Sequence, residues 1–97
     1  MAQLNETIHQ TVRLRIMAAL VTLEAGDEVD FTYLRELLDV TDGNLGAHLR
    51  KLEDAGYIAI NKTYVDRKPR TYVAATAEGR LIFQEHVAAL ESILKSQ

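Results

Sequence analysis

Residues 32–56 read TYLRELLDVTDGNLGAHLRKLEDAG, and this stretch predicts two helices joined by a tight turn. Apolar residues recur at helical spacing over about 32–38 and again over about 41–55. Thr41 or Asp42 is a good N-cap for the second helix, and Gly56 suits the left-handed position that ends it. Two short helices connected in this way form a helix-turn-helix pattern. The side chains predicted to face the core are Leu34, Leu37, Leu38, Leu45, Leu49 and Leu52.

A β-hairpin is predicted directly after the second helix, over about 57–75. Residues 57–65 alternate as a strand does, and residues 71–75 form a second apolar run. Between them lies the polar tip Asp66-Arg67-Lys68-Pro69-Arg70, which holds three cations and the only proline of the chain.

Further elements are predicted on either side of this region. A first helix spans about 11–24, with a helical lead-in from Asn5, and a brief strand follows at 29–31. The last helix spans about 76–95, begins at a Thr76 cap and is about 28 Å long. We therefore expect a single domain over residues 1–97, mainly α with a small β-hairpin, an α+β fold.

Composition narrows the class of protein. The chain has 97 residues, of which 47% are hydrophobic and 26% charged, as in an ordinary globular domain. It has no cysteine, so a disulfide framework and a thiolate metal site are excluded. The longest apolar run, at 16–23, is too short to span a membrane. The start of the chain carries no secretory signal, and we expect a cytoplasmic protein.

Charge is distributed unevenly along the chain. The formal net charge is −3, yet residues 44–70 hold six cations against three carboxylates, a net of +3, which leaves −6 for the remainder. A protein needs to be basic only on the face that meets phosphates. This segregation favours a nucleic-acid-binding face.

The outward side of the second helix of the pair carries side chains suited to base recognition. Asn44 can pair with adenine, Arg50 with guanine, and Ala47 can touch a thymine methyl. Gly43 and Gly46 each cost about 1 kcal/mol in a helix, which makes sense where DNA must come close; the alternative is a frayed first turn. The predicted DNA-binding residues are Thr41, Gly43, Asn44, Gly46, Ala47, His48, Arg50, Lys51, Lys62, Arg67, Lys68 and Arg70.

Spare apolar faces on the first and last helices predict a homodimer. On the last helix Phe83, Val87, Leu90 and Leu94 form one stripe, and a second stripe lies beside it. A helix apolar over so wide an arc is buried on two sides, by a partner subunit or by one oversized core groove. The predicted dimer-interface residues are Leu14, Met17, Val21, Ile82, His86, Ala89 and Ile93.

Neither a metal site nor a catalytic site is predicted. Of the three histidines, His9, His48 and His86, the last has Glu85 beside it and Glu91 beyond it, and neither carboxylate is at a spacing that would share a helix face with His86. No glycine-rich phosphate loop, nucleophile turn or HExxH motif is present. We expect a protein without a cofactor that is not an enzyme.

Several segments together resemble a known family. They are RLRI at 13–16, DFTYL at 30–34, TDGNL at 41–45, HLRKLE at 48–53, AGYI at 55–58, RKPRT at 67–71 and TAEGR at 76–80. They resemble the small stand-alone winged helix-turn-helix transcriptional regulators, similar to the MarR and ArsR groups. Many members carry serine where this chain has Gly46 and Ala47.

The resemblance implies a winged helix fold with a long C-terminal dimerisation helix. It also implies a homodimer that places two copies of the helix at 41–55 in successive major grooves of an operator, with the hairpin as a wing on the backbone or minor groove. Because the chain has no room for a separate ligand domain, any small-molecule effector is expected at the dimer interface or between that interface and the DNA-binding helices. The alternative is a winged helix that binds another protein and no DNA, which the acidic net charge favours slightly.

Overall fold

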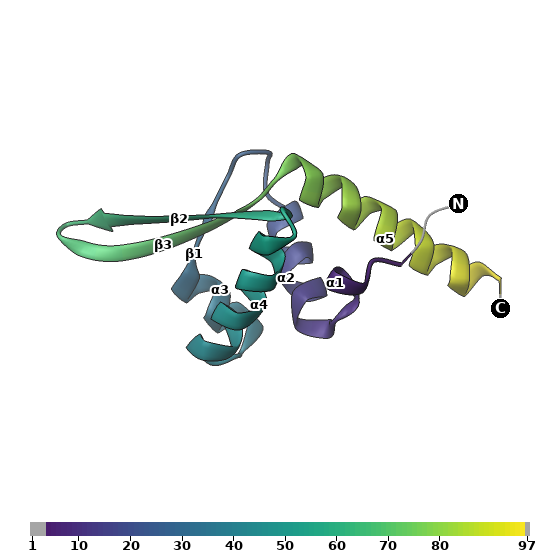
Figure 1. The fold of residues 1–97 in the computed structure, drawn as a ribbon, viewed down its shortest axis with the longest axis horizontal. Coiled ribbons are helices and arrows are strands. Elements are labelled where there is room, and N and C mark those ends of the chain that lie inside the picture. The colour runs from purple at the N-terminus through teal and green to yellow at the C-terminus, as the bar shows by residue number, and fades with distance from the viewer. Residues whose placement is uncertain (1–3, 97) are drawn as a thin grey trace.

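The computed structural model describes residues 4–96, which form five helices and a three-stranded antiparallel sheet (Figure 1). This confirms the predicted mainly helical fold with a β-hairpin. In chain order the elements are α1 (Glu6–His9), α2 (Thr11–Val21), β1 (Val29–Asp30), α3 (Phe31–Leu38), α4 (Asp42–Asp54), β2 (Ile58–Val65), β3 (Lys68–Ala75) and α5 (Ala77–Lys95).

Helix α2 is the centre of the core. It contacts α1, α3, α4, α5 and β3, and its Ile16, Met17 and Leu20 are fully buried. Leu37, which the pattern placed inside, is 51% exposed, because α3 buries only one side through Leu34 and Leu38. The other buried apolar side chains of the core cluster are Ile8, Leu34, Leu38, Leu45, Leu49, Leu52, Ile58, Val73 and Ala75.

The helix-turn-helix is confirmed as α3 and α4. Asp39 ends α3 in the left-handed conformation, and an ion pair of 2.9 Å from Arg35 Nε to Asp42 Oδ1 spans the turn. Thr41 is the N-cap of α4, since its Oγ1 accepts from the Asn44 amide at 3.1 Å. At the other end Gly56 has φ of +84°, as a glycine after a helix often does.

The hairpin differs from its prediction at the tip. The strands run on to a two-residue turn, Asp66-Arg67, in which both residues have positive φ. Lys68, Pro69 and Arg70 therefore belong to β3 rather than to a loop, because a two-residue turn of this kind matches the twist of the paired strands. The short β1 pairs with β3 on its other side, with Val29 opposite Val73.

The N-terminal helical region is divided in two. The predicted lead-in is a separate helix, α1, because Gln10 is extended, and α2 ends at Val21 rather than near Glu24. Asn5 fixes α1 in place. Its Oδ1 accepts from the Ile8 amide, its Nδ2 donates to the Tyr57 hydroxyl, and its backbone N–H donates to His86 Nδ1, each at 3.0 Å.

Helix α5 begins at the predicted Thr76 cap and extends away from the domain. The Thr76 Oγ1 accepts from the Gly79 amide at 2.9 Å and donates to the Gly56 carbonyl at 2.7 Å. The hairpin and α5 project in opposite directions, which gives the molecule extents of 53 × 25 × 21 Å (Figure 1). Within residues 4–96 no helix has the length and apolarity needed to cross a membrane.

Candidate nucleic-acid interface

Helix α4 exposes the face on which most of the predicted base contacts lie. Leu45, Leu49 and Leu52 turn inward and hold the helix on the core. The predicted DNA-binding residues Thr41, Gly43, Asn44, Ala47, Arg50 and Lys51 are exposed, whereas Gly46 and His48 are half-buried. The outer face combines small residues with amide and cationic side chains, a surface that can approach a base edge closely.

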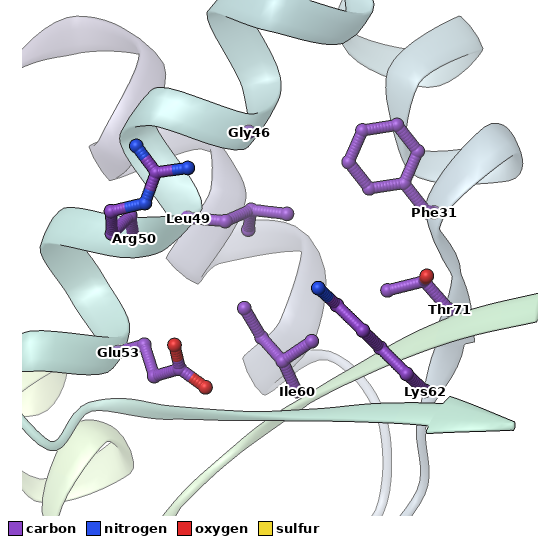
Figure 2. A pocket seen from close by; sticks show the side chains of 8 residues that line it. All are labelled: Phe31, Gly46, Leu49, Arg50, Glu53, Ile60, Lys62 and Thr71. Carbon is purple, nitrogen blue, oxygen red and sulfur yellow. The ribbon is translucent and has the colours of Figure 1, made fainter.

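A groove of about 550 Å³ separates α4 from the hairpin (Figure 2). Arg50 and Glu53 line it from α4, and Ile60 and Lys62 line it from β2. Lys62 and Ile60 share this side because residues two apart on a strand point to the same face. In Figure 2 the Lys62 side chain reaches from the strand toward α4. The groove thus has one cation on each wall, the Glu53 carboxylate on the α4 wall, and apolar side chains between the walls.

The sequence prediction missed five residues of this groove: Phe31, Leu49, Glu53, Ile60 and Thr71. Glu53 lies three residues after Arg50 and could have been placed beside it by helical spacing. Thr71 could not, because its place follows from the pairing of Lys62 with Thr71 across the two strands.

The cations of the hairpin are exposed, but they are not equivalent. Arg67 lies in the turn, and Lys68 follows it at the start of β3. Arg70 lies farther from the tip, and its Nη1 is 3.9 Å from the Asp30 carboxylate of β1. The charge of Arg70 is therefore partly compensated within the protein. The sequence prediction placed Arg70 among the cations of the hairpin tip, without this carboxylate beside it.

His48 contacts another helix of its own chain. Its Nδ1 lies 3.2 Å from Nη1 of Arg13, a residue of α2 that the sequence prediction did not include. Burial, and after it the positive charge of Arg13, lowers the pKa of His48. The ring is accordingly neutral near pH 7.

The predicted dimer-interface residues divide into three groups by their burial within the single chain. Met17, His86 and Ala89 are buried within the single chain. Leu14, Val21 and Ile82 are half-buried against the same core. His86 and Ala89 are buried because this side of α5 faces α1 and α2. Ile93, at 46% exposed, remains on the surface.

The neighbouring apolar stripe of α5 is half-buried over most of its length and exposed at its end. Leu94 is 71% exposed, and Phe83 and Val87 line a shallow groove of about 330 Å³. Val21 of α2 and Arg80 of α5 also line this groove. Arg80 ties the two helices together, because its Nη2 donates to the Leu23 carbonyl at 2.8 Å and to the Glu24 carbonyl at 3.0 Å.

His86 is a buried structural histidine. Its Nδ1 accepts from the Asn5 amide, so the neutral ring carries its proton on Nε2, which lies 3.4 Å from His9 Nδ1. A metal bound at Nε2 would require a proton on Nδ1, where it would oppose the Asn5 N–H. Over residues 4–96 no three His, Cys, Asp or Glu side chains are grouped so that they could hold a metal ion.

Comparison with known proteins agrees with this fold. A family model described as a winged helix DNA-binding domain matches residues 12–94. An uncharacterized protein of Methanocaldococcus jannaschii is 34% identical over 88 residues, which cover 91% of this chain and 92% of that one.

Solved structures of transcriptional regulators are also similar. A transcriptional regulator homologue of Pyrococcus horikoshii has a TM-score of 0.86 and 30% identity, covering 95% of this chain and 88% of that one. A MarR-like transcriptional regulator of Thermotoga maritima has a TM-score of 0.65 and 26% identity, covering 98% of this chain and 66% of that one.

Proposed function

Because the chain belongs to the winged helix DNA-binding domain family, we propose that it is a sequence-specific transcriptional regulator that binds operator DNA as a homodimer. Helix α4 enters the major groove, and the hairpin acts as a wing on the backbone or in the minor groove. The protein acts by binding and not by catalysis.

The observation that carries this proposal is the cationic groove between α4 and the hairpin. In duplex DNA one phosphodiester strand separates each major groove from the adjacent minor groove. When α4 lies in the major groove and the hairpin lies in the adjacent minor groove, this phosphodiester strand lies over the groove of the protein, between Arg50 and Lys62. Lys62 contacts the phosphates there and sets the register, while Asn44, Ala47 and Arg50 read base edges.

The homodimer is supported by the exposed apolar side of α5. Leu94 is 71% exposed, and Phe83 and Val87 of α5 line the groove of about 330 Å³ together with Val21 of α2. Burial of such side chains against a second copy would add apolar contact that a domain of this size lacks. A two-fold dimer requires an operator of near-palindromic half-sites spaced by about 10 bp or a multiple of it.

The same groove is the site that we propose for a small-molecule effector. It adjoins the surface at which the subunits meet, and it is lined by both α2 and α5. A ligand there would change how the two subunits are placed, and therefore the separation of their α4 helices.

The experiment that tests the proposal is selection from a randomised duplex pool, followed by binding of the selected site over a salt series. We expect a two-fold symmetric site and an affinity that falls steeply as salt rises. Weak binding with no enriched sequence would overturn the proposal and favour a protein-binding winged helix.

Two variants separate base reading from phosphate binding. Arg50→Ala should relax base preference at one position of each half-site. Lys68→Ala should weaken binding to all sequences alike and lower the salt slope by about 0.9 for each phosphate that the protein no longer neutralises. If both variants bind the selected site as the natural protein does, the docking geometry is wrong.

A further inference from the structure

Arg13 and His48 are brought together by the packing of α2 against α4. The Nη1 of Arg13 lies 3.2 Å from Nδ1 of His48, although the two residues are 35 positions apart. The guanidinium is held from its other side as well, because its Nε donates to the Thr7 carbonyl at the start of the chain. Arg13 therefore has a defined position beside the imidazole.

The chemistry of the pair determines which nitrogen of His48 carries the proton. A guanidinium has only donors and keeps its charge throughout the ordinary pH range. The imidazole nitrogen that faces it must accept, so Nδ1 of His48 carries a lone pair. In a neutral imidazole the other nitrogen, Nε2, is then the N–H donor.

The donor nitrogen of His48 is left free by the protein. Among residues 4–96 no group accepts a hydrogen bond from Nε2 of His48. This atom is also not buried, because it is absent from the buried side-chain nitrogen and oxygen atoms of these residues that lack a partner. His48 follows the exposed Ala47 and lies four residues after Asn44, so its neighbours on α4 belong to the proposed DNA-binding face. The free N–H is thus accessible beside groups proposed to meet DNA.

We infer that Arg13 is a positioning residue that holds His48 in the Nε2–H tautomer, so that α4 presents a neutral hydrogen-bond donor to an acceptor on the DNA. This inference rests on the proposed function. The acceptor is guanine N7 or O6, adenine N7, thymine O4 or a phosphate oxygen, whereas cytosine, which offers only its amino group in the major groove, is rejected. The lowered pKa of His48 agrees with this role, because it favours the neutral ring in the free protein.

The tautomer is measured first, on the free protein, by ¹⁵N NMR of the imidazole nitrogens near pH 7.5. We expect a protonated Nε2 for His48 in the natural protein and in Arg13→Lys, which keeps a donor-only group. Arg13→Glu places an acceptor beside Nδ1 and should shift the proton to Nδ1. The His86 signals report whether the fold is preserved in each variant.

Two results of that measurement would overturn the inference. One is a protonated Nδ1 in the natural protein, which needs no variant to be observed. The other is an unchanged tautomer in a folded Arg13→Glu protein. Neither result depends on DNA, so the tautomer is tested even if the proposed function fails.

The role of the donor is tested with two substitutions at His48 that keep different parts of the ring. His48→Gln places an amide N–H near the position of Nε2, whereas His48→Asn can still accept from Arg13 but has no donor there. We expect His48→Asn to lose roughly three- to tenfold in affinity for the selected site, and His48→Gln to recover most of it.

The sequence dependence of the loss identifies the acceptor. A loss confined to sites with one particular base, guanine, adenine or thymine, at one position of each half-site indicates a base contact, and an equal loss on all sequences indicates a phosphate. Equal affinities for the Asn variant and the natural protein on every sequence would overturn the role of the donor.

Discussion

Arg67 is a cation in a backbone conformation that disfavours its side chain. Its φ is +66°, and Asp66 before it has φ of +51°. A left-handed conformation costs an L-residue about 1–2 kcal/mol, which glycine avoids. We expect Arg67→Gly to raise the free energy of unfolding by about 1 kcal/mol, measured with urea, and to weaken DNA binding with a shallower salt slope.

Asp66→Gly is the matched control for Arg67→Gly. It relieves the same type of strain in the same turn but removes an anion instead of a cation. The Asp66 variant should therefore gain stability without losing affinity for DNA. If Arg67→Gly also keeps its full affinity, the tip of the hairpin does not contact phosphate.

His86 should make folding sensitive to acid. Burial, and after it the neighbouring His9, lowers the pKa of His86. Below about 6.5, the ordinary histidine pKa, the unfolded chain binds a proton that the folded chain resists. The free energy of unfolding should therefore fall as pH drops from 7 to 5. His48 contributes in the same direction.

Urea unfolding at several pH values measures this effect. His86→Asn can keep the acceptor for the Asn5 amide but cannot titrate, so we expect a shallower pH dependence than in the natural protein. His48→Asn removes the second contribution. An unchanged pH dependence in the double variant would mean that neither histidine is responsible.

Helices α4 and α5 use glycine near their starts for different reasons. A Cβ on Gly79 of α5 would lie 2.0 Å from the Tyr57 carbonyl oxygen, because the helix begins against the backbone that leaves α4. A Cβ on Gly43 or Gly46 of α4 would meet nothing within 4 Å. The fold requires the first glycine and does not require the other two.

Alanine substitutions should separate these roles. Gly79→Ala should lower the free energy of unfolding by about 1–3 kcal/mol, because the start of α5 must move. Gly43→Ala and Gly46→Ala should each raise it by up to about 1 kcal/mol. If the α4 glycines admit DNA closely, both α4 variants should also bind the operator more weakly. Unchanged binding would mean that these glycines have no role at the DNA.

The whole molecule has an elongated shape that a second subunit would complete. The C-terminal half of α5 lies away from the sheet and the α3–α4 pair (Figure 1). There Ile93 is 46% exposed and Leu94 is 71% exposed. In the proposed dimer these side chains face the partner, so the two α4 helices are joined through α5.

Leu94→Asp should dissociate the dimer, as measured by sedimentation equilibrium, and should lower operator affinity about a hundredfold or more, because a monomer binds without avidity. Leu37→Asp is the control, since Leu37 is also an exposed leucine, at 51%, but lies on α3. That variant should remain dimeric. A dimeric Leu94→Asp protein would place the interface elsewhere.

Local patterns were sufficient to predict the helix-turn-helix, the hairpin and the caps at Thr41 and Thr76. Each cap is a hydrogen bond between residues three apart, and each buried stripe recurs within one helix. The end of α4 at Gly56 follows equally local chemistry. Such features depend on neighbours in the chain, so the order of residues specifies them.

Tertiary packing decided what local spacing left open. Both apolar stripes of α5 satisfy helical periodicity, and the choice of the His86 side depends on its bond to Asn5, 81 residues away. The contact of Arg13 with His48 and the pairing of β1 with β3 likewise join distant segments. Periodicity shows that a face is apolar but not what covers it, because the partner is set by how the elements pack in space.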